Sequence, residues 1–279
     1  MGGRGSASGR SQSAYEKVVD SWHDENSKRV EAVLRTQQEM LRREAEEMFD
    51  PEVWENVDRK TFVEEHVREF TLTREHLKSI QDALEDEYTE TMRNKFGDPP
   101  KLIFTHHENH QLNSDIVDGK RVYNVQMNPW TRTGEQHSSI VRHEFGHWVH
   151  TQTVMRDWSQ KKRIDRAGKK DFENLKKRFG ARSFRTSSDV GEAIFGKKYS
   201  ALSSEEKRAA AIITDSFGSV SNGHYDVGHG SAYFKKQNKG GLSYGEAIAN
   251  LNQLRKTKYN SLNRSLFPNL SKVLDDMRK

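Results

Sequence analysis

The segment His143-Glu144-Phe145-Gly146-His147 places two imidazoles and one carboxylate in the pattern HExxH. Two histidines four positions apart lie one above the other on the same face of an α-helix, so both rings can bind one Zn²⁺ ion. The glutamate between them can take a proton from a water molecule beside the ion. This is the most chemically specific pattern in the chain, and it predicts a hydrolytic site with one catalytic zinc ion.

A catalytic zinc needs a third protein ligand, and one position must stay open for water. After His147 the chain continues as WVHTQTVMRDWSQ, without the glycine and third histidine that metzincins carry there. We therefore expect a distant ligand. Glu246 is the best candidate, because it is an acid at the start of an apolar helical segment, and the alternative ligands are Asp215, His224 and His229.

Glu246 also has a structural interpretation. Ser243 and Glu246 fit a capping box, in which the glutamate side chain accepts a hydrogen bond from the backbone at a helix start. A second capping box, formed by Ser203 and Glu206, is expected to open a helix that ends at Asp215. We favour the ligand role for Glu246, because the two histidines need a partner.

Residues 215–234 form a glycine-rich segment that we expect to be a loop framing the site. Amide hydrolysis places negative charge on the former carbonyl oxygen, and a histidine or tyrosine donor near it lowers the barrier. We assign this role to His229, with Tyr233 and Tyr244 as alternates. The alternative is a surface loop whose histidines are incidental.

The order of these motifs resembles the zincin-like, gluzincin-type metallopeptidase domain of phage minor head and head-morphogenesis proteins. The resemblance covers roughly residues 100–279 and the opening MGGRGSASG, and its motifs are HEFGH, DSFG at 215–218, GHG at 228–230 with Tyr233, EAIAN at 246–250, and FPNL at 267–270. It implies that Glu246 is the third ligand and that Asn250, where gluzincins carry Asp, orients a zinc histidine. It also implies a phage or prophage origin, with capsid or portal proteins as partners.

The predicted fold class is α+β and predominantly helical. We expect a disordered Gly/Ser/Arg tail over 1–13, a charged helical region over 14–98, and a zincin-like metallopeptidase domain with a small sheet over 99–279. Periodicity predicts helices over 14–48, 73–95 and 138–154. Strands are predicted over 102–105 and 122–127, and the second of these is a candidate edge for pairing with an extended substrate.

Charge is segregated along the chain. Residues 44–91 hold 16 acids and 5 bases, whereas residues 156–185 hold 12 bases and 4 acids. The basic segment is predicted to be a solvated insertion, and nucleic-acid binding is the less favoured alternative. The chain has no cysteine, which excludes disulfides and cysteine-bound zinc. The absence of an apolar leader or a long apolar run predicts no signal peptide, no membrane contact, and a location in the host cytoplasm or the virion.

Together these features predict a zinc metallopeptidase acting on a peptide or protein substrate. In this reading His143, His147 and Glu246 bind zinc and Glu144 is the general base. Two alternatives stay open. The chain could be a non-catalytic virion or head-morphogenesis protein that uses the fold to bind protein or DNA, or it could be a phage-borne proteolytic toxin or effector.

Overall fold

The computed structural model describes residues 14–51, 58–70, 74–104, 110–127, 134–180, 184–239 and 243–279. The predicted disordered tail lies outside these residues. Contacts divide the chain into two units, Met1–Leu77 and Lys78–Lys279. The division falls before the boundary that we expected near residue 98. The reason is that Tyr88 and Phe96 pack their rings against Trp148, with ring centroids 6.5 and 5.5 Å away, and so belong to the second unit.

The first unit contains two charged helices, α1 (Ala14–Met48) and α2 (Arg59–Phe70). They contact each other, and the rings of Phe49 and Phe62 lie 5.5 Å apart near their junction. Asp58 caps the start of α2 by accepting a hydrogen bond from the backbone N–H of Thr61 at 3.0 Å. The prediction of a long charged helix over 14–48 is confirmed.

The single helix predicted over 73–95 is wrong, because the chain forms α3 (Arg74–Glu87) and α4 (Glu90–Phe96) there. Thr89 separates them: its hydroxyl accepts a hydrogen bond from the backbone N–H of Met92 and so starts a new helix. The apolar spacing continues across this break, which is why periodicity alone missed it.

A three-stranded sheet follows, made of β1 (Lys101–Phe104), β2 (Gln111–Val117) and β3 (Lys120–Met127). The strand order is β1-β3-β2, with β1 parallel and β2 antiparallel to β3. β3 is therefore the central strand, and its prediction as a substrate-pairing edge is wrong because both of its edges are occupied. β2 was not predicted, although the Asp118-Gly119 turn, with φ of 50° and 74°, is a hairpin signal.

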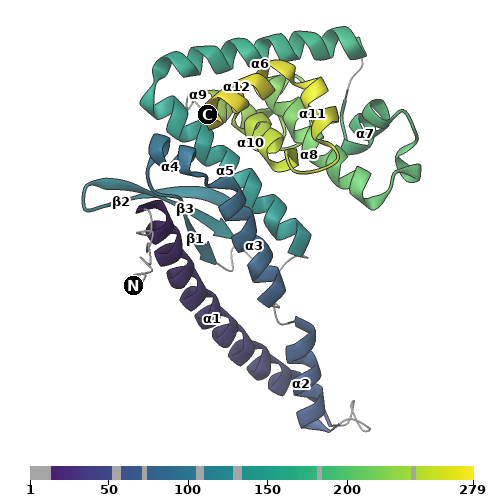
Figure 1. Ribbon diagram of the computed structural model, residues 1–279. Coiled ribbons are helices and arrows are strands. Elements are labelled where there is room, and N and C mark those ends of the chain that lie inside the picture. Colours follow the sequence, from purple (N-terminus) through teal and green to yellow (C-terminus); the bar gives the residue numbers. More distant parts are fainter. Residues whose placement is uncertain are drawn as a thin grey trace, which may run out of the picture. The chain divides into compact units, whose positions relative to one another are not determined.

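The rest of the second unit is helical (Figure 1). α10 lies between α5 and α8 and contacts both. Large apolar side chains from these helices fill the core, among them Trp148, Phe217, Ile248 and Phe267, each fully buried. The helices and the short 3₁₀ segment are α5 (Gly134–Arg156), α6 (Trp158–Phe179), α7 (Ser187–Phe195), η2 (Tyr199–Ala201), α8 (Ser204–Val220), α9 (Ser231–Lys239), α10 (Gly245–Leu254), α11 (Asn260–Leu266) and α12 (Pro268–Arg278).

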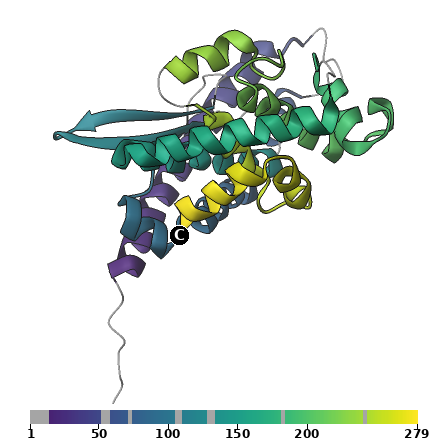
Figure 2. The ribbon, with the colours of Figure 1, turned by 90° about the horizontal axis from the view of Figure 1, so that it is seen from above.

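The basic segment forms a helix of this unit that packs one face against the core, while most of its cations are exposed to solvent. α6 runs along α12 (Figure 1, Figure 2) and buries Ile164 and Leu175. Its buried Asp171 accepts hydrogen bonds from the backbone N–H groups of Asn269 and Leu270 at 3.0 and 2.8 Å, which caps the start of α12. The predicted class, α+β and predominantly helical with a small sheet, is confirmed at this level. None of the described helices combines the length and apolar character needed to cross a bilayer.

Candidate metal centre

The HExxH residues lie on α5 (Gly134–Arg156). This helix is longer at both ends than the predicted helix over 138–154. Phe145, Trp148 and Val149 are fully buried and fix the rotation of the helix in the core. Gly146 sets its distance from α10, because a Cβ atom at this position would lie 2.6 Å from the Cα of Ala249. The absence of a side chain at Gly146 therefore lets the two helices that carry the candidate ligands approach closely.

The structure excludes the capping interpretation of Glu246. α10 begins after Tyr244, whose φ is 65°, and the side chain that caps its first turn is that of Ser219, which accepts a hydrogen bond from the backbone N–H of Ala247 at 3.3 Å. The predicted capping box of Ser243 and Glu246 is therefore wrong. Glu246 stands in the first turn of α10, 2% exposed, with its carboxylate beside the two histidines of α5. The other predicted capping box, Ser203 with Glu206, is present at the start of α8.

Three side-chain atoms form a nearly equilateral triangle. The Nε2 atoms of His143 and His147 lie 3.1 Å apart, and each lies 3.3 Å from Oε2 of Glu246. Ligand atoms at about 2.0–2.1 Å from a tetrahedral Zn²⁺ ion lie about 3.3 Å from one another. Oε2 is buried without a hydrogen-bond partner, which is costly unless a cation completes it. The donor set and its spacing thus fit a zinc ion.

The other oxygen of Glu246 is held by α9. Tyr233 donates its hydroxyl hydrogen to Oε1 at 2.5 Å, and Gln237 donates to the same atom at 3.0 Å and to the Tyr233 hydroxyl at 2.8 Å. These bonds orient the carboxylate so that Oε2 faces the histidines. Gln237 was not predicted, although its position four residues after Tyr233 places both side chains on one face of α9.

Asp215 and His229 stand next to this triangle. Together with Glu246 they form a second group whose ligand atoms lie within 4.8 Å of one another. Asp215 accepts a hydrogen bond from the His229 backbone N–H at 3.1 Å, and the His229 side chain is 53% exposed. Asn250 donates to Oδ2 of Asp215 at 3.3 Å. The Asn250 side chain therefore contacts Asp215 on α8 and not His143 or His147 on α5, so its predicted role in orienting a histidine is wrong.

The predicted loop is shorter than expected. α8 continues through Asp215 to Val220, so the expected helix end at Asp215 is wrong, and α9 starts at Ser231. Gly218 lies inside α8, where a Cβ atom would be 2.4 Å from the Phe234 ring. Gly218 therefore allows the Phe234 ring to pack closely against α8. The prediction that this glycine belongs to a turn is wrong.

The remaining predicted residues divide into two groups. Glu144 is buried beside the triangle, at 4% exposure, and its charge acts on His143. His224 and Tyr244 instead pack against α6. The His224 ring lies 5.8 Å from that of Phe172, and the Tyr244 ring covers Gly168. Neither belongs to a metal-binding group among the described residues.

The electrostatics of the site reflect its burial. Burial alone would lower the pKa of His143, but its close contact with Glu246 and the charges of Glu144, Glu246 and Asp215 raise it to about 9. Burial would raise the pKa of Glu246, but the charge of His147 and the close contacts with both imidazoles lower it. Burial and the Glu246 charge raise the pKa of Asp215. The site therefore favours a carboxylate facing positive charge.

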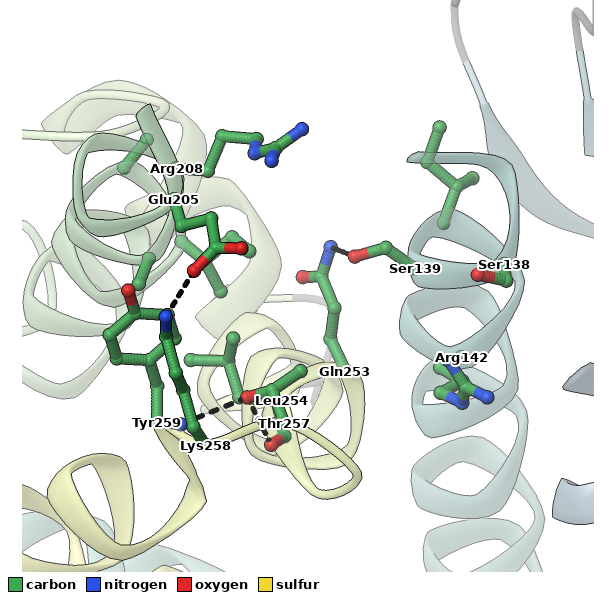
Figure 3. A pocket seen from close by; sticks show the side chains of 14 residues that line it. Ser138, Ser139, Arg142, Glu205, Arg208, Gln253, Leu254, Thr257, Lys258 and Tyr259 are labelled. Atoms are coloured by element: carbon green, nitrogen blue, oxygen red, sulfur yellow. Dashed lines mark hydrogen bonds and ion pairs between the residues drawn. The ribbon is translucent and has the colours of Figure 1, made fainter. Parts of the chain in front are cut away.

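A pocket of about 560 Å³ is lined by residues of α5, α8, α10 and the segment after α10 (Figure 3). Ser139, on its wall, precedes His143 by one turn of α5, and Ile212 precedes Asp215 by one turn of α8. Gln253 follows Glu246 by two turns of α10 and donates to Oγ of Ser139 at 2.9 Å. The pocket is therefore lined by the same three helices that carry Glu246, the two histidines and Asp215, and its lining includes none of these four residues. Its other lining residues include Ile140, Arg142, Glu205, Arg208, Leu254, Thr257, Lys258 and Tyr259.

Comparisons of the chain with family models, with curated proteins and with solved structures found no match.

Proposed function

We propose that this protein is a zinc-dependent metallopeptidase. The observation that carries the proposal is the triangle formed by His143, His147 and Glu246, with a buried carboxylate oxygen that has no hydrogen-bond partner. The residues come from helices about a hundred positions apart in sequence, so their convergence is a property of the fold. The resemblance to the zincin-like domain of phage head proteins supports the same chemistry and suggests a phage or prophage origin.

His143, His147 and Glu246 would hold the zinc ion. When bound, zinc supplies a Lewis acid that lowers the pKa of water and polarises a carbonyl group. Glu144 takes the proton from the attacking water and delivers it to the leaving nitrogen. His229, which is partly exposed at the edge of the site, donates a hydrogen bond to the carbonyl oxygen as it gains charge. Tyr233 and Gln237 hold Glu246 in place.

We further propose that the neighbouring pocket, lined by other residues of α5, α8 and α10, receives a substrate side chain. Ser139 is four residues from His143, which corresponds to about 6 Å along the helix axis. An extended peptide advances about 3.3 Å per residue, so a side chain about two residues from the scissile bond reaches the pocket. Apolar walls formed by Ile140, Ile212 and Leu254 suit an aliphatic part of such a side chain.

The test combines metal content with cleavage. We expect about one zinc ion per purified chain by elemental analysis, and cleavage products from a denatured protein or peptide library by mass spectrometry. Glu144→Gln should keep the zinc and reduce cleavage by at least about 100-fold, because it removes the general base. Glu246→Ala should lose the zinc, and Glu205→Ala, an exposed acid of the pocket, is the matched control that keeps it.

Protein without stoichiometric zinc would contradict the proposal. Zinc binding without cleavage of any substrate would favour the non-catalytic virion or head-morphogenesis role. If Glu246→Ala retains the metal fully, the third ligand is Asp215 or His229.

A further inference from the structure

The basic helix α6 carries a row of cations that the metal site does not use. Its exposed face presents Lys162, Arg166, Lys169, Lys170 and Lys177. At 100° per residue these five side chains fall within a sector of about 100°, and they extend over about 22 Å of helix. The opposite face, with Ile164, Ala167 and Leu175, is buried against the rest of the unit. The charged row therefore faces outward.

Three other α6 cations have carboxylate partners. Lys161 pairs with Asp165 at 3.0 Å, Arg163 pairs with Asp276, and Lys176 pairs with Glu173 at 2.6 Å. Arg178 lies over the Phe179 ring and falls outside the sector of the row. Within the described part of the chain, none of the five residues of the charged row forms a salt bridge. Fixed positive charges aligned at helical spacing attract a polyanion, because binding releases the counterions that surround it.

We infer that the charged row of α6 binds the phosphate backbone of nucleic acid. A linear polyanion can reach all five cations at once along the outside of the helix, which Figure 1 shows running along the edge of the C-terminal helices. An acidic protein surface fits less well, because protein interfaces are depleted in lysine and enriched in aromatic residues at their centres. The exposed aromatic residue of this helix is Trp158 at its first turn, 64% exposed, where it can stack on an unpaired base.

The experiment measures binding of labelled single-stranded and duplex 30-mers of mixed sequence to the full chain by fluorescence anisotropy between 50 and 200 mM salt. Five phosphate contacts predict a slope of log K against log salt of about −4.5 on duplex, or about 500-fold weaker binding across this range. The triple variant Lys162→Gln, Lys169→Gln, Lys170→Gln should reduce the slope to about −1.8. Salt-dependent binding of either nucleic-acid form, lost in this variant, supports the inference.

The matched control also removes three positive charges, but from lysines outside α6. Lys101→Gln, Lys120→Gln and Lys235→Gln change exposed lysines of β1, β3 and α9, and should leave the slope unchanged. Equal loss in both triple variants would overturn the inference, because net charge and not the α6 row would then drive binding. Competition by poly-glutamate as effective as that by DNA of equal charge would also overturn it, in favour of an acidic protein partner. Far-UV circular dichroism checks that both variants fold.

Discussion

Replacing Gly146 with alanine is expected to force apart the two helices that carry the candidate zinc ligands. The new Cβ atom would lie 2.6 Å from the Cα of Ala249 and 3.2 Å from its carbonyl oxygen. Carbon atoms in contact ordinarily lie about 3.5 Å apart, so α5 and α10 must separate by about 0.9 Å. Backbone atoms on both sides leave no flexible side chain that could absorb the change.

Two opposing effects determine how Gly146→Ala changes the free energy of unfolding. Alanine favours the helix by about 1 kcal/mol over glycine, whereas overpacking a core costs about 1–3 kcal/mol. We expect a net loss of about 1 kcal/mol in the free energy of unfolding. The effect on metal binding is larger, because metal–ligand distances tolerate only about 0.2 Å and Glu246 moves with α10. Zinc affinity should fall by at least about 10–100-fold.

The assay is chelator competition for zinc, together with urea unfolding of the metal-free protein. Gly191→Ala is the matched control, since it makes the same change in helix α7, away from the metal triangle. Its nearest contact is Cδ1 of Leu202 at 3.1 Å, the end of a flexible side chain. We expect the control to keep its zinc affinity. A Gly146→Ala protein with the zinc affinity and stability of the wild type would refute this reasoning.

Three further predictions concern other contacts. Tyr233→Phe removes the donor at 2.5 Å from Oε1 of Glu246 and should weaken zinc binding about 10-fold in chelator competition, whereas unchanged affinity would show that Gln237 alone orients the carboxylate. Glu87→Gln leaves Arg255 and Arg278 without their buried carboxylate, 2.9 and 2.6 Å away, and should cost about 3–5 kcal/mol in urea unfolding; a cost below about 1 kcal/mol would contradict this. Burial lowers the pKa of His150 to about 3, from about 6.5 in the unfolded chain. The unfolded chain then binds the proton first as pH falls, so stability should decrease by about 1.4 kcal/mol per unit well below pH 6.5, and His150→Gln should flatten this part of the urea-derived profile between pH 7 and 5.

Local patterns predicted the parts of the site that depend on one segment. The HExxH helix follows from the 3.6-residue period, because His143 and His147 share a face whatever the tertiary fold. β1 and β3 follow from short apolar runs, and the Ser203 capping box follows from two residues three apart. The ligand role of Glu246 was favoured only because two histidines need a partner, and the choice against its capping role needed the backbone of Tyr244.

Other features depend on contacts between distant segments. Gly218 looks like a turn residue in sequence, but the Phe234 ring against it shows that α8 needs a gap at this position. β2 is mostly exposed and mixes polar residues with Leu112, Ile116 and Val117 without strict alternation, so its hydropathy pattern is weak and pairing with β3 defines it. The hydrogen-bond partners of Asn250 and Gln237 could not be predicted from the sequence, because they lie on other helices that only the fold brings close.

The geometry around Glu246 leaves one buried carboxylate oxygen facing two imidazole rings. Tyr233 and Gln237 occupy Oε1, while Oε2 faces two imidazole nitrogens at 3.3 Å and has no other partner. A buried carboxylate oxygen left in this state costs about 1–3 kcal/mol, and more when it is charged. The charges of Glu144, Glu246 and Asp215 and the contact with Glu246 raise the pKa of His143 to about 9, which favours a positive imidazolium beside Oε2. If zinc binds here as we propose, it takes the place of that proton, and we expect zinc binding to release a proton.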